Sequence, residues 1–255
     1  MFLNTRLAPF NDVRVRRAVN YAVDRNRMVD LRGGPDLWQT SCQVLPPNLD
    51  GYRRYCPYTT GPNPDGTYAG PDLVKARRLV ALSGTKGQGV TVAGIAGIFQ
   101  PHGGDYFVSV LRSLGYRARF KNFKDAQTYF GTAGDSRRKI QAGIFGWAED
   151  YPSAGNWFPL LFTCSSFTPG GRGNANFAEF CDPRIDAEIA RARSLQTTDP
   201  GAASRLWSKI DRDVVDRAPM VFLQNPLQVD FVSRRVGNYQ YNPQWGALLD
   251  QLWVR

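Results

Sequence analysis

Between Pro71 and Trp147 the sequence alternates between two hydrophobic periods, and this alternation limits the folds open to the chain. Stretches with apolar residues three to four apart, typical of helices, are followed by stretches that alternate residue by residue, as in strands. Glycines follow two of the helical stretches and can end them in a left-handed conformation. The expected elements are a helix at 71–84, a strand at 89–95, a helix around 107–114, a strand at 117–123, a short helix near 125–130 and a strand at 140–147. This order predicts an α/β fold with a mixed sheet flanked by helices.

The segment before this region predicts one basic amphipathic helix. Asn11 and Asp12 offer an N-cap, and the helix would run to about Leu31. One face is apolar and carries Val15, Ala18, Val19 and Ala22. The other face is basic and carries Arg14, Arg17, Arg25 and Arg27. Such a helix could lie on a membrane, but a face built of valine and alanine favours packing into a core.

The remaining elements lie on either side of the α/β alternation. Residues 33–70 are dense in Gly, Pro, Asn and Tyr and predict irregular structure. Two Asp-Pro pairs, at 182–183 and 199–200, predict helix starts, because proline is well tolerated at the first helical position. Strands are expected at 220–223 and 229–232. A chain of 255 residues can bury a sizeable core, so one α/β domain with loops pinned by disulfides is expected.

Four cysteines fall into two local pairs, Cys42 with Cys56 and Cys164 with Cys181. Each pair brackets a loop rich in Gly, Pro and Ser, where a disulfide contributes roughly 3 kcal/mol in the chain-entropy model. Three connectivities are possible, and the local one is favoured; four free thiols are the alternative. The spacing does not suit a zinc site. Paired cysteines favour an oxidising compartment and hence export, so a signal peptide is expected upstream of this chain.

Net charge is the strongest signal in the composition, with 32 Lys and Arg against 22 Asp and Glu, which gives +10. Such a surplus suits a nucleic-acid backbone or an anionic membrane. The arginines are scattered along the chain, however, whereas nucleic-acid binders concentrate them on one arm or stripe. A solvated arginine-rich surface is therefore favoured, and no nucleic-acid partner is expected. No window approaches 18 consecutive apolar residues, so no membrane span is expected.

Motifs for catalysis are weak, and no catalytic residue, metal or cofactor is expected. His102 is the sole histidine and lies in a turn-like stretch; no G-x-S-x-G motif and no phosphate-binding loop is present. Glu149 and Asp150 could suggest a carboxylate-dependent hydrolase. Adjacent residues at a strand end point to opposite sides, however, whereas paired catalytic carboxylates must face each other across a substrate.

The segment from Gly146 to Tyr151 is the best candidate for a ligand site. It follows an expected central strand, and ligands of open α/β sheets bind at the carboxyl ends of strands. Trp147 offers an apolar platform, and Asp150 can bind a cation through a charge-assisted hydrogen bond. These residues suit a ligand with an ammonium group beside an apolar body. In the alternative interpretation, Trp147 and Tyr151 belong to the core and Asp150 caps the next helix.

Three stretches carry a family resemblance. They are P-F-N-D-V-R-V-R-R-A at 9–18 with A-V-D-R at 22–25, P-D-L-V-K-A-R-R-L at 71–79, and G-W-A-E-D-Y-P at 146–152. In order and spacing they resemble the C-terminal lobe of the family 5 extracellular solute-binding proteins of ABC importers, which include peptide- and oligopeptide-binding proteins. The chain departs from the family at 152–156, where it has P-S-A-G-N in place of the frequent Asp-Pro.

The resemblance implies one lobe of a two-lobed, type II periplasmic-binding-protein fold. Residues 1–230 would form the second lobe, including the hinge segment at its start, and residues 231–255 would return toward the first lobe. The extended segments at 2–5 and 229–255 would then be hinge crossings and return residues. The first lobe, the signal peptide and a lipid anchor would lie outside this chain.

The resemblance also implies a function and its residues. The chain would take part in solute capture, with a peptide as the expected solute, and deliver it to an ABC permease from the periplasm or the outer face of the membrane. Asp150 would pair with the α-ammonium of the peptide, while Trp147 and Tyr151 would line the pocket. An oligosaccharide, a nickel chelate or haem are the alternative solutes.

Overall fold

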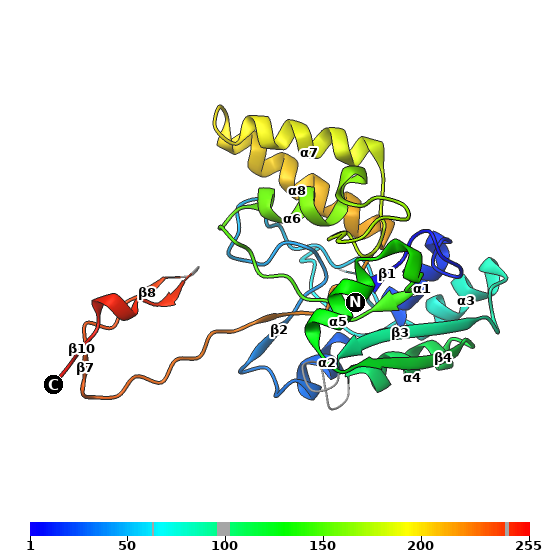
Figure 1. The fold of residues 1–255 in the computed structure, drawn as a ribbon, viewed down its shortest axis with the longest axis horizontal. Coiled ribbons are helices and arrows are strands. Elements are labelled where there is room, and N and C mark those ends of the chain that lie inside the picture. The colour runs from blue at the N-terminus through cyan, green and yellow to red at the C-terminus, as the bar shows by residue number, and fades with distance from the viewer. Residues whose placement is uncertain (63, 96–102, 243–244) are drawn as a thin grey trace.

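The computed structural model describes residues 1–62, 64–95, 103–242 and 245–255, and a four-stranded mixed sheet lies in its main body (Figure 1). The strand order is β1 (Phe2–Leu3), β5 (Ala142–Gly143), β3 (Gly89–Ile95) and β4 (Arg117–Phe123). β3 runs parallel to β4 and β5, while β1 is antiparallel to β5. The α/β fold with a mixed sheet is as predicted.

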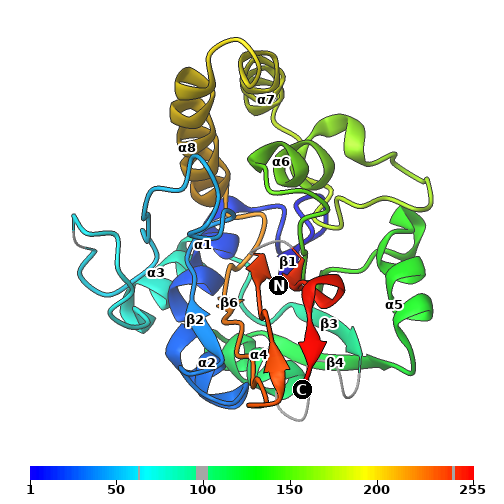
Figure 2. The same ribbon diagram turned by 90° about the vertical axis from the view of Figure 1, so that its left-hand side faces the viewer.

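Helices cover both faces of this sheet, because alternate residues of β3 point to opposite sides. Val90 and Val92 pack with α1 (Val13–Ala22), α3 (Leu73–Ser83) and α4 (Gly103–Ser113). Ala93 and Ile95 belong to a second apolar cluster. That cluster includes side chains from α5 (Ala126–Ala133), α6 (Ala154–Phe162), α7 (Pro183–Leu195) and α8 (Pro200–Arg217). Helices α7 and α8 lie side by side at the top of Figure 2.

Sequence patterns located several elements to the residue. The strands at 89–95 and 117–123 have the predicted bounds. Helix α3 ends at Gly84, which adopts the left-handed conformation with φ 66°. Helices α7 and α8 begin at the two Asp-Pro pairs. The aspartates, Asp182 and Asp199, accept hydrogen bonds from backbone N–H groups of the first turns.

The single helix expected up to Leu31 is wrong, because the chain breaks at Asp24 into α1 and α2 (Arg25–Leu31). Asp24 is extended, and its side chain caps α2 by accepting from the backbone of Arg27. Arg25 was placed on the exposed basic face, yet it is fully buried. Its guanidinium donates to backbone oxygens of Asn20, Ser41, Tyr58 and Phe222.

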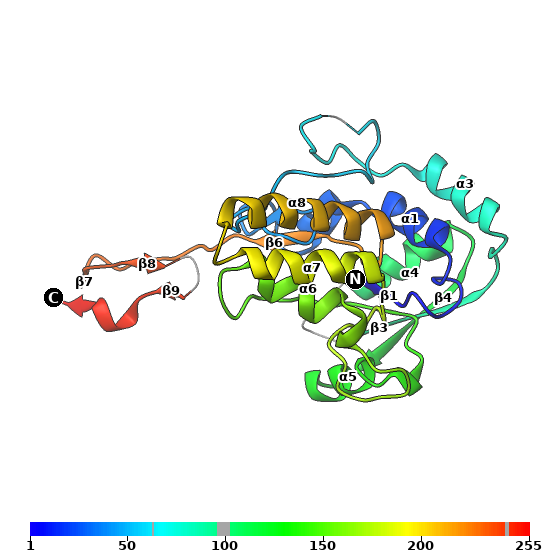
Figure 3. The ribbon, with the colours of Figure 1, turned by 90° about the horizontal axis from the view of Figure 1, so that it is seen from above.

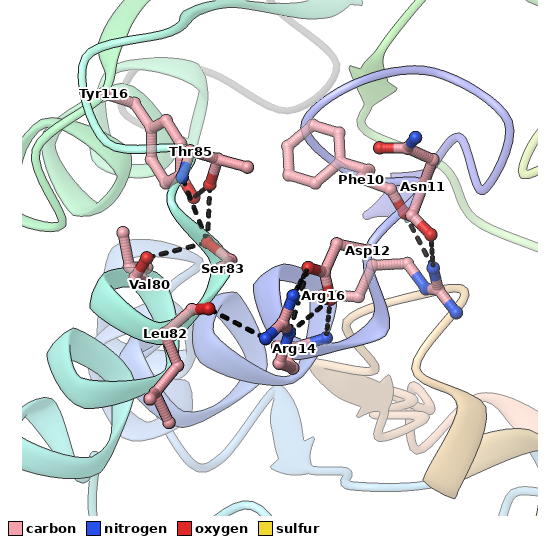
Figure 4. Close-up of polar contacts among 10 residues, drawn as sticks. All are labelled: Phe10, Asn11, Asp12, Arg14, Arg16, Val80, Leu82, Ser83, Thr85 and Tyr116. Carbon is pink, nitrogen blue, oxygen red and sulfur yellow. Dashed lines mark hydrogen bonds and ion pairs between the residues drawn. The ribbon is translucent and has the colours of Figure 1, made fainter.

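Helix α1 is also tied to α3 by a residue expected to face solvent (Figure 4). The Asp12 carboxylate caps α1 by accepting from the backbone N–H of Arg14 at 2.8 Å. The Arg14 guanidinium is paired with that carboxylate, and its Nη1 donates to the backbone oxygen of Leu82 on α3 at 2.8 Å. The charged face of α1 therefore helps to fix the neighbouring helix.

Three strand predictions need correction. The strand expected at 140–147 is reduced to β5, and the chain after Ile144 continues without a sheet partner. Residues 229–232 form no strand. At 220–223 only an isolated bridge from Met220 to Phe2 forms. The paired residues follow directly, in β6 (Gln224–Pro226). This strand forms an antiparallel ribbon with β2 (Trp38–Thr40), which lies in the otherwise irregular 33–70 region.

Both local disulfides are present, Cys42–Cys56 and Cys164–Cys181, as the cysteine spacing predicted. The first closes the loop that follows β2. The second joins the 3-10 turn after α6 (Cys164–Ser166) to the residue before the N-cap of α7. The loops of the lobe are therefore pinned by disulfides.

Beyond β6 the chain leaves the body of the lobe as an extended arm (Figures 1 and 3). The arm contains two short ribbons, β7 (Val236–Gly237) with β10 (Trp253–Val254), and β8 (Tyr241–Asn242) with β9 (Gly246–Ala247). None of its described residues is buried, and Phe231 is 98% exposed. Among the described residues no helix has both the length and the apolar character that crossing a membrane requires.

Candidate functional site

A cavity of about 810 Å³ lies beside the carboxyl end of β5. Its walls are segment 144–149, the loop segment 43–48 and residues 220–228. The indole rings of Trp38, Trp147 and Trp157 contribute to the lining, together with the ionisable side chains of Arg32 and Glu149. A volume of this size and a mostly apolar lining with a few polar groups are typical of small-molecule sites.

Segment 144–149 forms one wall because β5 ends early. Every residue from Ile144 to Glu149 contributes to the lining. Within the described part of the chain, the backbone N–H and C=O groups of Gly146, Trp147 and Ala148 make no hydrogen bond. This stretch therefore offers backbone groups to a partner along the cavity.

Trp147 lies in the lining, where the sequence analysis expected a ligand platform. Its Nε1 donates to Oδ1 of Asn156 at 3.2 Å, and its ring lies roughly parallel to that of Phe145, 6.5 Å between centroids. Asn156 is buried on α6. Trp147 is thus held from both sides, by an amide and by an aromatic ring.

Asp150 and Tyr151 lie beside the cavity but outside its lining. The backbone N–H of Asp150 donates to Oδ1 of Asn156 at 3.0 Å, and its carboxylate accepts from Nδ2 of the same amide at 3.1 Å. Asp150 is exposed, and Tyr151 is 51% exposed. Ser153 rather than Asp150 caps α6, and Tyr151 is not a core residue, so the alternative interpretation is wrong for these two residues. For Trp147 it holds in part, because this partly buried side chain packs against the second apolar cluster.

Asn156 is the residue of this site that sequence reasoning missed. One buried amide fixes both Trp147 and Asp150, two of the three predicted ligand residues. Helix α6 itself was not predicted, because Gly155, Asn156 and Pro159 all disfavour a helix interior. A polar residue six positions after a candidate carboxylate was the available signal.

A cation–π contact holds the charged lining residue Arg32 in place. Arg32 lies over Trp38, with 4.2 Å between its Cζ and the ring centroid. Partial burial lowers the pKa of Arg32, but a guanidinium stays protonated near neutrality. The cavity therefore holds a fixed cation on one wall and the Glu149 carboxylate on another.

No metal or catalytic arrangement is recognisable at this site. Within residues 1–62, 64–95, 103–242 and 245–255, no group of three or more His, Cys, Asp or Glu side chains could hold a metal ion. The sole histidine, His102, lies outside the described residues. The geometry offers aromatic platforms, hydrogen-bonding groups and charges, which are typical of small-molecule binding sites.

The sequence profile of the bacterial extracellular solute-binding proteins, family 5 Middle, matches residues 1–169. The chain is 24% identical to the probable di/tripeptide-binding protein 5 of Pseudomonas aeruginosa, over 94% of this chain and 43% of that protein. It is 26% identical to heme-binding protein A of Haemophilus influenzae, over 94% and 41%. The chain thus spans less than half the length of these curated relatives.

Solved structures agree with the fold. Clavulanic acid biosynthesis oligopeptide binding protein 2 superposes with a TM-score of 0.82 and 28% identity, over 99% of this chain and 45% of that one. The dipeptide-binding protein of Pseudoalteromonas sp. SM9913, in complex with Met-Leu, superposes with a TM-score of 0.76 and 19% identity, over 100% and 47%.

Proposed function

Because this chain belongs to the bacterial extracellular solute-binding proteins of family 5, we propose that it forms one lobe of a receptor that captures peptides for an ABC importer. Residues 1–230 are the ligand-binding lobe, and residues 231–255 are the arm that returns to the other lobe. The relatives that the chain matches include di- and tripeptide-binding proteins more than twice its length. Such a receptor works in the periplasm or on the outer face of the membrane and hands its ligand to a permease.

The observation that carries this proposal is the backbone of residues 146–148, whose N–H and C=O groups make no hydrogen bond to the described part of the chain. An extended peptide can add to an exposed strand through main-chain hydrogen bonds, with pockets for alternate side chains. Gly146, Trp147 and Ala148 offer such groups along the cavity. The surrounding indole rings can pack against side chains of many kinds, since aromatic faces supply large apolar contacts without demanding one shape.

We assign Asp150 to the α-ammonium of the peptide and Trp147 and Tyr151 to its flanking contacts. Asn156 holds the Asp150 carboxylate at the rim of the cavity, and that carboxylate has further acceptor capacity beyond this one hydrogen bond. Closure of the second lobe would remove water from the rim and strengthen the ion pair. The ligand drives closure only by binding the closed state better than the open one.

The test uses the full-length, two-lobed protein and isothermal calorimetry with synthetic di- and tripeptides. Asp150→Ala should weaken binding by roughly 2–5 kcal/mol, because an ammonium would be buried without its partner. The exposed Asp105 on α4 supplies the control, and Asp105→Ala should bind as the parent does. Peptides with an acetylated amino terminus should bind weakly and show no further loss in Asp150→Ala.

Two results would contradict parts of this proposal. Equal peptide affinity in Asp150→Ala would remove the ammonium role from Asp150. A protein that ignores peptides but is stabilised by haem, an oligosaccharide or a nickel chelate would keep the binding role and change the solute. Similarity to heme-binding protein A makes haem the first non-peptide ligand to include in the panel.

A further inference from the structure

A loop without regular secondary structure forms one wall of the ligand cavity. It is the loop segment 43–48, which lines the cavity through Gln43, Val44, Pro46, Pro47 and Asn48. Two prolines stiffen it, but neither helix nor sheet hydrogen bonds hold it in place. Its position must therefore be set by contacts to another part of the lobe.

Those contacts converge on one buried carboxylate. Asp211 of α8 is 1% exposed. Its Oδ1 accepts from the backbone N–H of Val44 at 2.9 Å, and its Oδ2 accepts from Nε2 of Gln43 at 2.7 Å and from the backbone N–H of Leu45 at 3.4 Å. Three donors from three consecutive residues of the wall thus meet a single side chain.

Gln43 extends this network to the far side of the loop. Its Oε1 accepts from the backbone N–H of Tyr55 at 2.7 Å, beside the Cys42–Cys56 disulfide. The Tyr55 hydroxyl in turn donates to Oδ1 of Asp216 at 2.7 Å, one turn further along α8. Both ends of the disulfide-closed loop are therefore held on the same helix.

The loop also packs closely against α8 at Gly51. Gly51 has φ +90°, and a Cβ there would lie 2.7 Å from the Cβ of Trp207 and 3.1 Å from the backbone oxygen of Ser204. The loop backbone thus lies directly on α8. The loop is therefore held on α8 by this close packing at Gly51 and by the hydrogen bonds to Asp211.

We propose that Asp211 is a positioning residue for ligand capture, which holds the cavity wall at 43–48 in its binding geometry through Gln43 and Val44. The inference rests on the proposed function for its ligand and on the contacts above for its mechanism. A carboxylate is required because it only accepts hydrogen bonds. The NH₂ of an asparagine would face the NH₂ of Gln43 and the N–H of Leu45 in one orientation and the N–H of Val44 in the other.

The experiment compares full-length variants by hydrogen exchange and by calorimetry with the tightest binder of a synthetic di- and tripeptide panel. Asp211→Asn should speed amide exchange in 43–48 and weaken peptide binding about tenfold or more. Adding Gln43→Glu restores a donor–acceptor pair with residue 211 but loses the hydrogen bond from Nε2 to the Arg53 backbone oxygen, so the double variant should recover binding only in part. Val80→Ala on α3 lies in the other apolar cluster, which contains no residue of 43–48, and should lose stability without changing peptide affinity.

Failure of the inference is distinguishable from failure of the proposed function. Unchanged exchange in 43–48 and unchanged peptide affinity in Asp211→Asn would overturn the positioning role while the parent still binds peptides. A parent that binds no peptide would overturn the proposed function and with it the link between this wall and peptides. If Asp211→Asn does not fold, Asp211→Glu keeps the acceptors, displaces them by one methylene and should give the same two changes; parental values would contradict the role.

Discussion

Arg16 on the first helix donates two hydrogen bonds to the backbone oxygen of Arg217, the last residue of α8, from Nε at 3.1 Å and from Nη2 at 2.9 Å. Arg17 does the same to the backbone oxygen of Asp216, at 3.0 and 2.9 Å. The last carbonyls of a helix have no partner within the helix and carry partial negative charge. Two guanidiniums from α1 supply both the hydrogen-bond donors and the positive charge, and so join α1 to the C-terminal end of α8.

Arg16→Lys should therefore destabilise the protein although it keeps the charge. A lysine ammonium cannot reproduce the fork that contacts the Arg217 carbonyl while Nη1 donates to Phe10 at 2.7 Å. Losing these buried charge-assisted bonds should lower the free energy of unfolding by about 1–3 kcal/mol, measured by urea denaturation. Arg27 is exposed on α2, and Arg27→Lys is the control. Equal losses in the two variants would contradict a specific role for Arg16.

Asp211 predicts an unusual pH dependence of stability. Burial raises the pKa of Asp211 to about 6 from its ordinary 3.8. Between pH 3.8 and about 6 the Asp211 carboxyl is protonated in the folded protein and ionised in the unfolded chain. The free energy of unfolding therefore falls as pH rises, by up to about 3 kcal/mol. This contribution is present below pH 4 and lost above pH 6.

Urea denaturation at pH 4, 5, 6 and 7 of the parent and of Asp211→Asn isolates this effect. The difference between their free energies of unfolding should change by up to about 3 kcal/mol across the series, since the variant cannot titrate. Asp135 does not interfere, because Arg137 lowers its pKa to about 2, and its opposite effect falls below this range. Parallel pH profiles for the two proteins would contradict the raised pKa.

Local signals in the sequence located those parts of the fold that local chemistry decides. Strands β3 and β4 could be placed because their apolar alternation is uninterrupted. The starts of α7 and α8 could be placed because each Asp-Pro pair combines an N-cap residue with a residue favoured at the first helical position. The break at Asp24 could not be foreseen, because the helical period of apolar residues continues across it. What decides the break is the burial of Arg25 among carbonyls from distant segments.

The candidate site divides in the same way. Trp147 and Asp150 stand in a short motif and could be named from the sequence, whereas their shared support by Asn156 depends on an unpredicted helix. The wall at 43–48 and Asp211 are 163 residues or more apart in the chain, and neither carries a motif. Contacts of this kind follow from tertiary packing, to which a single sequence gives no periodic signal.

The Cys164–Cys181 disulfide should contribute more to stability than to binding. It links two residues 17 positions apart, and none of residues 163–181 lines the cavity, although Phe162 does. Beside it, the Cys164 backbone N–H donates to the Asp186 carboxylate of α7. Replacing both cysteines by alanine should lower the free energy of unfolding by about 3 kcal/mol and leave peptide affinity unchanged. Alkylation of the parent should add mass at four sites after reduction and at none before it. A loss of affinity in the folded variant would contradict this separation of roles.

The arm at 231–255 should be dispensable for the stability of this lobe. None of its described residues is buried, and large apolar side chains such as Phe231 and Trp245 are exposed at 98% and 71%. An exposed segment contributes little burial to the folding of the body, so removing it costs the body almost no hydrophobic free energy. Chains 1–230 and 1–255 should therefore unfold at the same urea concentration, with 1–230 the more soluble because an exposed apolar surface promotes association. In the full-length protein the same deletion should lower the free energy of unfolding, since the contacts of the arm with the other lobe would be lost. A markedly lower free energy of unfolding for chain 1–230 than for chain 1–255 would contradict the boundary at residue 231.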